Sequence, residues 1–290
     1  MLTATQDDVY FERMASSLGD KARLLHLTHG SRVLDVGAGG GEFAELERIN
    51  GKQVTAVDGS WVALDHIREN FPLVDRVHEY AHSLHYEFKE DEFDTVVCSA
   101  LMHEVYSYGT EASPPYSLHA VDEVLESIWT VTKTEGTLLI RDGVMPREWD
   151  KPVRIETAPG ATSDVLAFFL WYAQQAPFFN TSGDPRTVHL RIGDDGRSLE
   201  GNLASAMEFL YTYTWGWEPS ERETRELYGI LTLDDWIDLL DNHGFTTRYS
   251  TEYVQPGYVE YLSTRVRIVD EQGAPVQWPS TNMILSAWKR

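Results

Sequence analysis

Three glycines at alternate positions follow a short apolar run near the start of the chain. The apolar run is 33–36, and Gly37-Ala38-Gly39-Gly40-Gly41 comes directly after it. A glycine-rich turn between a strand and a helix bends tightly, lets the backbone approach a ligand and points the first amides of the helix toward it. A dinucleotide fingerprint has the spacing Gly-x-Gly-x-x-Gly, and a Walker loop ends in Gly-Lys-Ser/Thr. The alternate spacing therefore predicts a ligand-binding turn that is poorly suited to cradling phosphates.

A carboxylate stands at the end of the next apolar run. This residue is Asp58, the last of the run 53–58, and it lies 17 residues beyond Gly41. A carboxylate at such a strand end can accept hydrogen bonds from both hydroxyls of a ribose. The turn and Asp58 together predict a site for a cofactor that contains a nucleoside.

With these two motifs the chain resembles the class I S-adenosylmethionine-dependent methyltransferases over roughly residues 10–145 and 229–290. Residues 33–41 resemble the first motif of that family, residues 56–60 its second, and residues 93–100 the motif of its fourth strand. The resemblance implies that the cofactor is S-adenosylmethionine and that the protein is an enzyme that transfers its methyl group.

The resemblance also implies a position for each part of the cofactor. Asp35 and the glycines would face the methionine moiety, Asp58 would hold the ribose, and residues 59–61 would lie beside the adenine. The family often has an acidic residue after the third strand that accepts the adenine amino group, whereas this chain has Tyr80-Ala81-His82-Ser83 there. Backbone amides and His82 would have to replace that residue. The expected cofactor-binding residues are Asp35, Gly37, Ala38, Gly39, Gly41, Asp58, Gly59, Ser60, Ala81, His82 and Ser99.

The methyl acceptor needs its own residues. Transfer to a hydroxyl or amine needs alignment of the nucleophile and a base that removes a proton. Ligands of parallel sheets lie beyond the carboxyl ends of the strands, which places residues 99–104 and 141–143 near the acceptor. We expect His103 or Glu104 as the base, although a histidine at this helix start in similar enzymes often only packs. Asp142 is a third catalytic candidate that would equally serve as a helix or turn cap, and the residues expected to orient the acceptor are Tyr106 and Tyr108.

Alternating strands and helices must position these residues. Apolar spacing predicts helices at 10–27, 42–50, 62–70 and 118–132, and strands at 31–36, 53–58, 93–98 and 136–141. This alternation predicts an α/β fold with a Rossmann-like parallel sheet and helices on both faces. A helix at 232–240 and strands at 245–253 and 282–288 would close it, similar to the terminal antiparallel hairpin of the family.

Residues 146–228 differ from this pattern and are rich in aromatic side chains. Helices at about 163–175 and 200–213, separated by a polar stretch, predict a mostly helical insertion into a core of residues 1–145 and 229–290. Most of the rings must pack, but some could form a cover and an acceptor pocket. The aromatic candidates for the acceptor pocket are Trp171, Tyr172, Phe178, Phe179, Trp215 and Trp217. Three arginines there, Arg186, Arg191 and Arg222, either pair with an anionic acceptor or lie on a solvated surface.

Composition excludes several function classes. The formal net charge of −22 disfavours nucleic-acid partners. No apolar stretch reaches the roughly 18 residues of a membrane span and the N-terminus lacks signal-peptide features, so a cytoplasmic location is expected. One cysteine, Cys98, gives neither a disulfide nor a cysteine-based zinc site, and the loop spacing of His78, His82 and His85 predicts no metal.

The acceptor is the open question at this point. A small organic molecule, methylated at O, N or C, fits the acidic charge and the aromatic insertion. The first alternative is an RNA, DNA or protein acceptor, but the Asn/Asp-Pro-Pro-Tyr/Phe tetrad of many base methyltransferases is replaced by Ser99-Ala100-Leu101-Met102. Transfer of another group of the cofactor, or a non-catalytic cofactor-binding role, are further alternatives.

Overall fold

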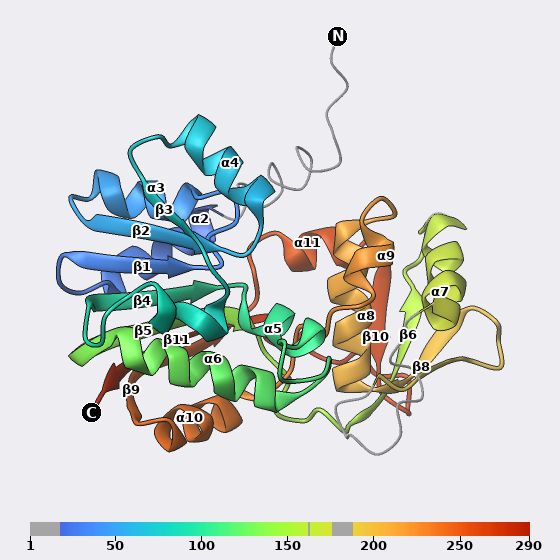
Figure 1. The fold of residues 1–290 in the computed structure, drawn as a ribbon. Helices are drawn as coiled ribbons and strands as arrows, with labels where there is room; N and C mark the ends of the chain where they lie inside the picture. The colour runs from blue at the N-terminus through green and yellow to red at the C-terminus, as the bar shows by residue number, and fades with distance from the viewer. Residues whose placement is uncertain (1–17, 162, 176–187) are drawn as a thin grey trace, which may run out of the picture. The chain divides into compact units, whose positions relative to one another are not determined.

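The computed structural model describes residues 18–161, 163–175 and 188–290, which form two compact units (Figure 1). Unit 1 comprises Met1–Asp142, Trp236–Thr251 and Met283–Arg290, and unit 2 comprises Gly143–Asp235 and Glu252–Asn282. Unit 2 thus includes the segment 252–282, which the sequence-based division had assigned to the core. Within the described residues, no helix combines the length and apolarity needed to cross a membrane.

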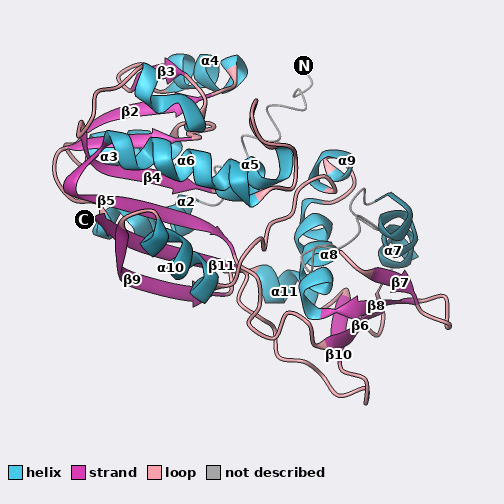
Figure 2. Ribbon diagram, turned by 60° about the horizontal axis from the view of Figure 1, so that its bottom comes forward, coloured by secondary structure: helices cyan, strands magenta, loops and turns pink. Residues whose placement is uncertain are grey.

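Unit 1 is built on a seven-stranded sheet with the order β3-β2-β1-β4-β5-β11-β9 (Figure 2). The strands are β1 (Arg32–Val36), β2 (Gln53–Asp58), β3 (Asp75–His78), β4 (Phe93–Ser99), β5 (Thr132–Gly143), β9 (Phe245–Tyr253) and β11 (Asn282–Lys289). The first five pair in parallel. The central strands are apolar because helices cover the sheet, and Leu34, Val97 and Leu139 have no exposed surface. The predicted Rossmann-like sheet is confirmed.

The last strand, β11, runs opposite to both of its neighbours. At its end, the Lys289 ammonium donates to the carbonyl of Thr132 at the start of β5 (2.7 Å). The next amide, that of Arg290, donates to the carbonyl of Gly244, which directly precedes β9 (3.0 Å). The end of β11 therefore lies beside the starts of β5 and β9. This geometry is that of the predicted antiparallel hairpin.

Helices connect these strands and cover the sheet. They are α3 (Glu42–Ile49), α4 (Trp61–Asn70), α5 (Met102–Tyr108), α6 (Leu118–Val131) and α10 (Leu233–Asn242). The helix predicted at 10–27 is described only from residue 18, as the short α2 (Leu18–Lys21) and the 3-10 helix η1 (Ala22–Leu27). A second 3-10 helix, η2 (Ala81–Tyr86), follows β3. Ser60 and Ser117 cap α4 and α6 by accepting amide hydrogens from Ala63 and His119.

Unit 2 contains a second sheet, which the sequence did not predict. Its four strands have the order β10-β6-β8-β7, and every pair is antiparallel. The strands are β6 (Pro152–Thr157), β7 (Leu190–Ile192), β8 (Ser198–Asn202) and β10 (Val266–Val269). The helices are α7 (Ser163–Gln175), α8 (Leu203–Trp215), α9 (Ser220–Glu223) and α11 (Tyr258–Leu262). The two helices predicted in the insertion are present as α7 and α8, whereas its strands were not predicted because strands of three to six residues leave only a weak alternating pattern.

Candidate functional site

The glycine turn joins β1 to α3 and is tied to the end of β2. The amides of Gly37 and Ala38 both donate to the carbonyl of Val57, at 2.8 and 3.0 Å, and the amide of Gly41 donates to the carbonyl of Ala38 at 3.0 Å. The φ angles of Gly37, Gly39 and Gly41 are 68°, 55° and 83°. Residues other than glycine rarely adopt such φ angles, so the alternate glycines permit this turn.

Asp58 ends β2 and holds the turn in place. One of its oxygens, Oδ2, accepts the amide hydrogen of Gly39 at 2.9 Å. The other, Oδ1, accepts that of Ser60 at 2.8 Å. Burial raises the pKa of Asp58, while the hydrogen bonds from Ser60 and Gly39 lower it. A carboxylate fixed in this way is a preorganised acceptor for ribose hydroxyls.

Two buried polar atoms near this turn suit a ligand. The Oδ2 atom of Asp35 and the hydroxyl of Ser99 have no hydrogen-bond partner among the residues that the structure describes. Asp35 is on β1 and Ser99 ends β4, the adjacent parallel strand. Burial raises the pKa of Asp35 to about 7; nearby Lys21 lowers it, and the carboxylates of Asp58, Glu47 and Glu42 raise it further. A ligand that carries an ammonium group would offset the cost of this buried carboxylate, and the methionine moiety of S-adenosylmethionine supplies one.

Aromatic rings surround Gly59, which directly follows Asp58. A Cβ atom at Gly59 would lie 2.8 Å from Cε1 of Tyr80, so a larger residue there would require the half-exposed Tyr80 ring to shift. His78 donates from Nε2 to the carbonyl of Gly59 (2.9 Å) and stacks on Trp61, with ring centroids 4.0 Å apart. Tyr80 stacks in turn on His82 at 5.7 Å. Both His82 and Gly59 were expected beside the adenine, and this arrangement offers flat apolar rings at that place.

Sequence reasoning missed His78 and Tyr80 as members of this group. His78 had been considered only as a metal ligand. The position of His78 could have identified it as a site residue, because it ends β3 in register with Asp58 at the end of β2. Residues at the carboxyl ends of adjacent parallel strands meet at one edge of the sheet, where ligands bind.

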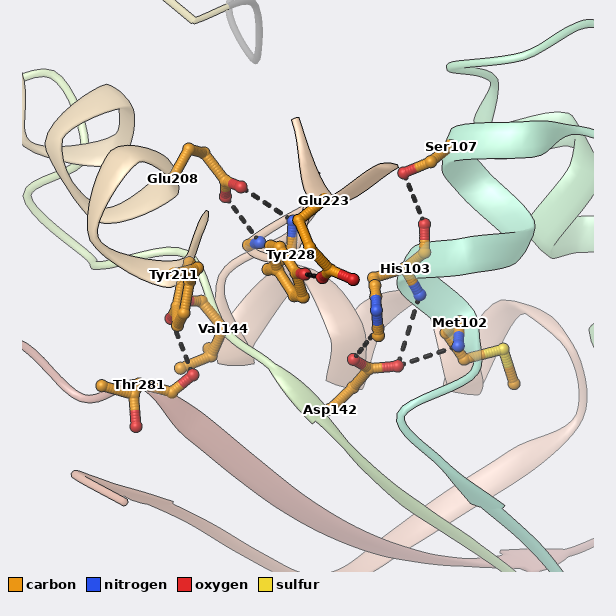
Figure 3. Close-up of polar contacts among 11 residues, drawn as sticks. Met102, His103, Ser107, Asp142, Val144, Glu208, Tyr211, Glu223, Tyr228 and Thr281 are labelled. Atoms are coloured by element: carbon orange, nitrogen blue, oxygen red, sulfur yellow. Dashed lines mark hydrogen bonds and ion pairs between the residues drawn. The ribbon is translucent and has the colours of Figure 1, made fainter. Parts of the chain in front are cut away.

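His103 and Asp142 form a buried pair within unit 1 (Figure 3). Nδ1 of His103 lies 2.6 Å from Oδ1 of Asp142, and the side chains are 6% and 2% exposed. The Oδ2 atom of Asp142 accepts the amides of Met102 (2.8 Å) and His103 (3.3 Å) at the start of α5. Asp142 therefore caps this helix and also contacts the imidazole. Since the imidazole bonds a carboxylate through Nδ1, that atom carries the proton.

The other candidates on α5 differ in exposure. Glu104 is partly exposed, and Tyr108 is 46% exposed. Tyr106 is 1% exposed, and its ring lies edge-on to that of Tyr116 at 6.3 Å. Tyr106 is therefore placed as a packing residue of unit 1, while Glu104 and Tyr108 have surface available to an acceptor.

The aromatic candidates of unit 2 lie mostly in one ring cluster. Trp171 and Trp217 contact each other at 5.6 Å, and both contact the buried Phe168. Tyr172 is fully buried beside Phe209, whereas Trp217 is 49% exposed. Trp215, the last residue of α8, is partly exposed. Phe178 and Phe179 lie outside the described residues.

The arginine candidates are neutralised where the structure describes them. Arg191 forms an ion pair with Glu200. Arg222 forms an ion pair with Glu223 at 2.5 Å, and Glu223 also accepts the hydroxyl hydrogen of Tyr228 (Figure 3). Arg186 lies outside the described residues. These pairings disfavour the interpretation that Arg191 and Arg222 await an anionic acceptor.

Gly41→Ala is expected to lower the free energy of unfolding by about 3 kcal/mol, because left-handed strain and a steric clash add. A Cβ atom at Gly41 would lie 2.6 Å from Cγ1 of Ile67. Gly51 is a matched control, since its φ is 85° and a Cβ atom there would meet nothing within 4 Å. Gly51→Ala should therefore cost only about 1 kcal/mol. Urea unfolding measures both, and equal losses would show that Ile67 moves aside without cost.

A family model described as a methyltransferase domain matches residues 34–140. This range contains the glycine turn, Asp58 and the first turn of α5. No curated protein sequence matches the chain.

Solved structures of S-adenosylmethionine-dependent methyltransferases share the fold at low sequence identity. The protein from Mesorhizobium loti is 14% identical, with 94% of this chain and 97% of that chain covered and a TM-score of 0.52. The protein from Archaeoglobus fulgidus is 13% identical, with coverages of 98% and 100% and a TM-score of 0.52. For the protein from Methanosarcina mazei the identity is 13%, the coverages are 92% and 96%, and the TM-score is 0.51.

The fold and the matched domain agree with the motifs of the glycine turn and Asp58. Residues 34–140 therefore form a methyltransferase domain, and the chain has the fold of S-adenosylmethionine-dependent methyltransferases.

Proposed function

We propose that this methyltransferase acts on a small organic molecule with a hydroxyl or amine nucleophile. The observation that supports such a nucleophile is the buried pair of His103 and Asp142, because these acceptors must lose a proton. The formal charge of −22 and the aromatic side chains of unit 2 favour a small acceptor over a polyanion. A cytoplasmic location is part of this proposal.

Bound S-adenosylmethionine supplies an electrophilic methyl group on a sulfonium. Asp58 and the glycine turn would hold its ribose and Asp35 its ammonium. Nε2 of His103 would take the proton that the acceptor oxygen or nitrogen loses on methylation. Asp142 would stabilise the resulting imidazolium through Nδ1, which it already contacts at 2.6 Å. Asp142 is thus a positioning residue in this scheme.

Two labels on the cofactor test the proposed reaction. The protein is incubated with a cell metabolite extract or with total RNA and protein, using S-adenosylmethionine labelled either in the methyl group or in the carboxyl group. Methyl label in the small-molecule fraction, absent with Asp58→Ala, is the expected result. Methyl label in RNA or protein would favour the macromolecular alternative. Transfer of the carboxyl label would instead indicate movement of the aminocarboxypropyl group, and no transfer at all would favour a binding role.

His103→Ala is expected to lower kcat for the acceptor found in this way by about 100-fold or more, which is the usual contribution of a positioned base. Its affinity for S-adenosylhomocysteine should stay within about twofold, because the base acts on the acceptor. Asp142→Asn should lower kcat and leave KM for the acceptor unchanged, because the substitution disturbs the tautomer of His103. His119→Ala is the control, because that imidazole is 69% exposed on α6. Unchanged turnover in His103→Ala would make His103 a packing residue.

A further inference from the structure

Two large aromatic side chains of unit 1 are exposed beside the end of β2. Trp61 is 66% exposed and Tyr80 is 52% exposed. The Tyr80 ring lies against Gly59, where the Cβ atom that glycine lacks would be 2.8 Å from Cε1 and 2.9 Å from Cδ1 of the ring. Tyr80 thus fills the space of a side chain at residue 59 and keeps half of its own surface open. An exposed ring in this position gains apolar contact when a flat ligand covers it.

Two imidazoles fix the position of the Tyr80 ring. His82 stacks on it with an interplanar angle of 18°, and His78 lies edge-on to it at 6.2 Å. His78 is itself held, because its Nε2 atom donates to the carbonyl of Gly59 at 2.9 Å and its ring stacks on Trp61 at 4.0 Å. Rings that are ordered before a ligand arrives lose little conformational entropy when it binds.

Asp58 directs a nucleoside to these rings. Its carboxylate is the proposed partner of the ribose hydroxyls, and Gly59 is the next residue of the chain. The base is attached directly to the ribose, so a ribose at Asp58 brings the base close to Gly59 and to the ring that covers it. A stacked aromatic ring binds any purine, because every base has a π face.

The polar groups beside Tyr80 do not select one edge of a base. The side chain at position 80 carries a hydroxyl in place of a carboxylate, and the acidic neighbour Glu79 uses Oε1 to accept the amide of Tyr80 at 2.7 Å. The Tyr80 hydroxyl and the His82 imidazole can each donate or accept a hydrogen bond, whereas a carboxylate only accepts. Both residues are also in contact with water, so neither is left unsatisfied when a base lacks an amino group.

We propose that the cofactor base is held by stacking on Tyr80 and that its exocyclic amino group contributes little to binding. The inference rests on the proposed use of S-adenosylmethionine. It departs from the arrangement that the resemblance implies, in which an acidic residue after the third strand accepts the adenine amino group. Tyr80 is then the residue that binds the base, and the site accepts purines that differ at position 6.

Two ligands that differ only in this amino group test the proposal. They are S-adenosylhomocysteine and its 6-deamino analogue, in which purine replaces adenine, and each is titrated by calorimetry into the full-length protein. Their dissociation constants should agree within about threefold, because the lost hydrogen bond is neutral and open to water. A preference of about tenfold or more for S-adenosylhomocysteine would overturn the proposal.

Variants of Tyr80 separate stacking from hydrogen bonding. Tyr80→Ala should weaken both ligands about tenfold, the usual effect of removing a ring on which a base stacks. Tyr80→Phe keeps the ring and should change neither affinity by more than about twofold. Unchanged affinity in Tyr80→Ala would overturn the proposal. A Tyr80→Phe protein that binds only S-adenosylhomocysteine more weakly would do so as well, because the hydroxyl would then recognise the amino group.

Two controls complete the experiment. Tyr86→Ala removes a ring that is 75% exposed on η2 and should leave both affinities unchanged. Glu79→Gln should leave the ratio of the two affinities unchanged, and a loss confined to S-adenosylhomocysteine would overturn the proposal in favour of Glu79. Failure of the wild type to bind S-adenosylhomocysteine at all would refute the cofactor assignment itself. Tight binding of S-adenosylhomocysteine with strong selectivity for the amino group would refute only the present inference.

Discussion

Asp58→Ala should weaken the binding of S-adenosylmethionine about 100-fold, because it would remove the two charge-assisted hydrogen bonds that we propose between Asp58 and the ribose. The variant also frees the amides of Gly39 and Ser60, which Asp58 now holds at 2.9 and 2.8 Å. The glycine turn would therefore lose preorganisation together with a ligand contact. Calorimetric titration of the protein with S-adenosylmethionine measures the change.

Asp65→Ala is the control for this experiment. Asp65 is on the adjacent helix α4, is 54% exposed and pairs with Arg68 at 2.6 Å. Removing it takes away one carboxylate without touching the turn, so the affinity should stay within about twofold. An Asp58→Ala protein that binds S-adenosylmethionine as tightly as the wild type would refute the assignment of Asp58 to the ribose.

Asp35→Asn should stabilise the cofactor-free protein at pH 8 but change little at pH 4. The folded-state pKa of Asp35 is raised from its ordinary value of 3.8 to about 7, chiefly by burial. A carboxyl group whose pKa is raised by folding lowers the free energy of unfolding as pH rises from its pKa in the unfolded state toward its pKa in the folded state. A pKa shift of this size corresponds to about 4 kcal/mol of lost stability at pH 8. Asparagine has no charge to bury, so the variant escapes this loss.

Urea unfolding of both proteins between pH 4 and pH 8 checks this expectation. The difference in unfolding free energy should grow with pH through the window from about 4 to about 7. Asp75→Asn, at an exposed position of β3, should show no such growth. The same Asp35→Asn protein should bind S-adenosylmethionine more weakly, because the carboxylate that would meet the cofactor ammonium is gone. A variant that gains no stability at pH 8 would show that Asp35 is not a strained buried acid.

The geometry of the glycine turn could be predicted from the sequence because it is local. The turn at residues 37–41 needs positive φ angles, and the glycines that allow them are adjacent in the sequence. Asp58 follows one strand later, and parallel strands of a Rossmann-like sheet place consecutive strand ends at one edge. His78 obeys the same rule, but no common motif marks it.

The pairing of the candidate base could not be predicted, because it depends on a contact between distant segments of the chain. His103 and Asp142 are 39 residues apart, and both were expected near the sheet edge. Only the structure shows that Asp142 caps α5 and contacts Nδ1 of His103 at once. Strand-end positions predict proximity, but they do not specify which atoms of two side chains meet.

By itself, the sequence determined the Rossmann-like core, the glycine turn and the carboxylate that contacts it, because each depends on short-range spacing and on residue types with few conformational alternatives. The tertiary structure alone decided the second sheet. Strand β10 pairs with β6 through residues such as Val266 and Thr157, more than a hundred positions apart. A strand of four residues has little periodicity of its own, so its place is set by the partners against which it packs.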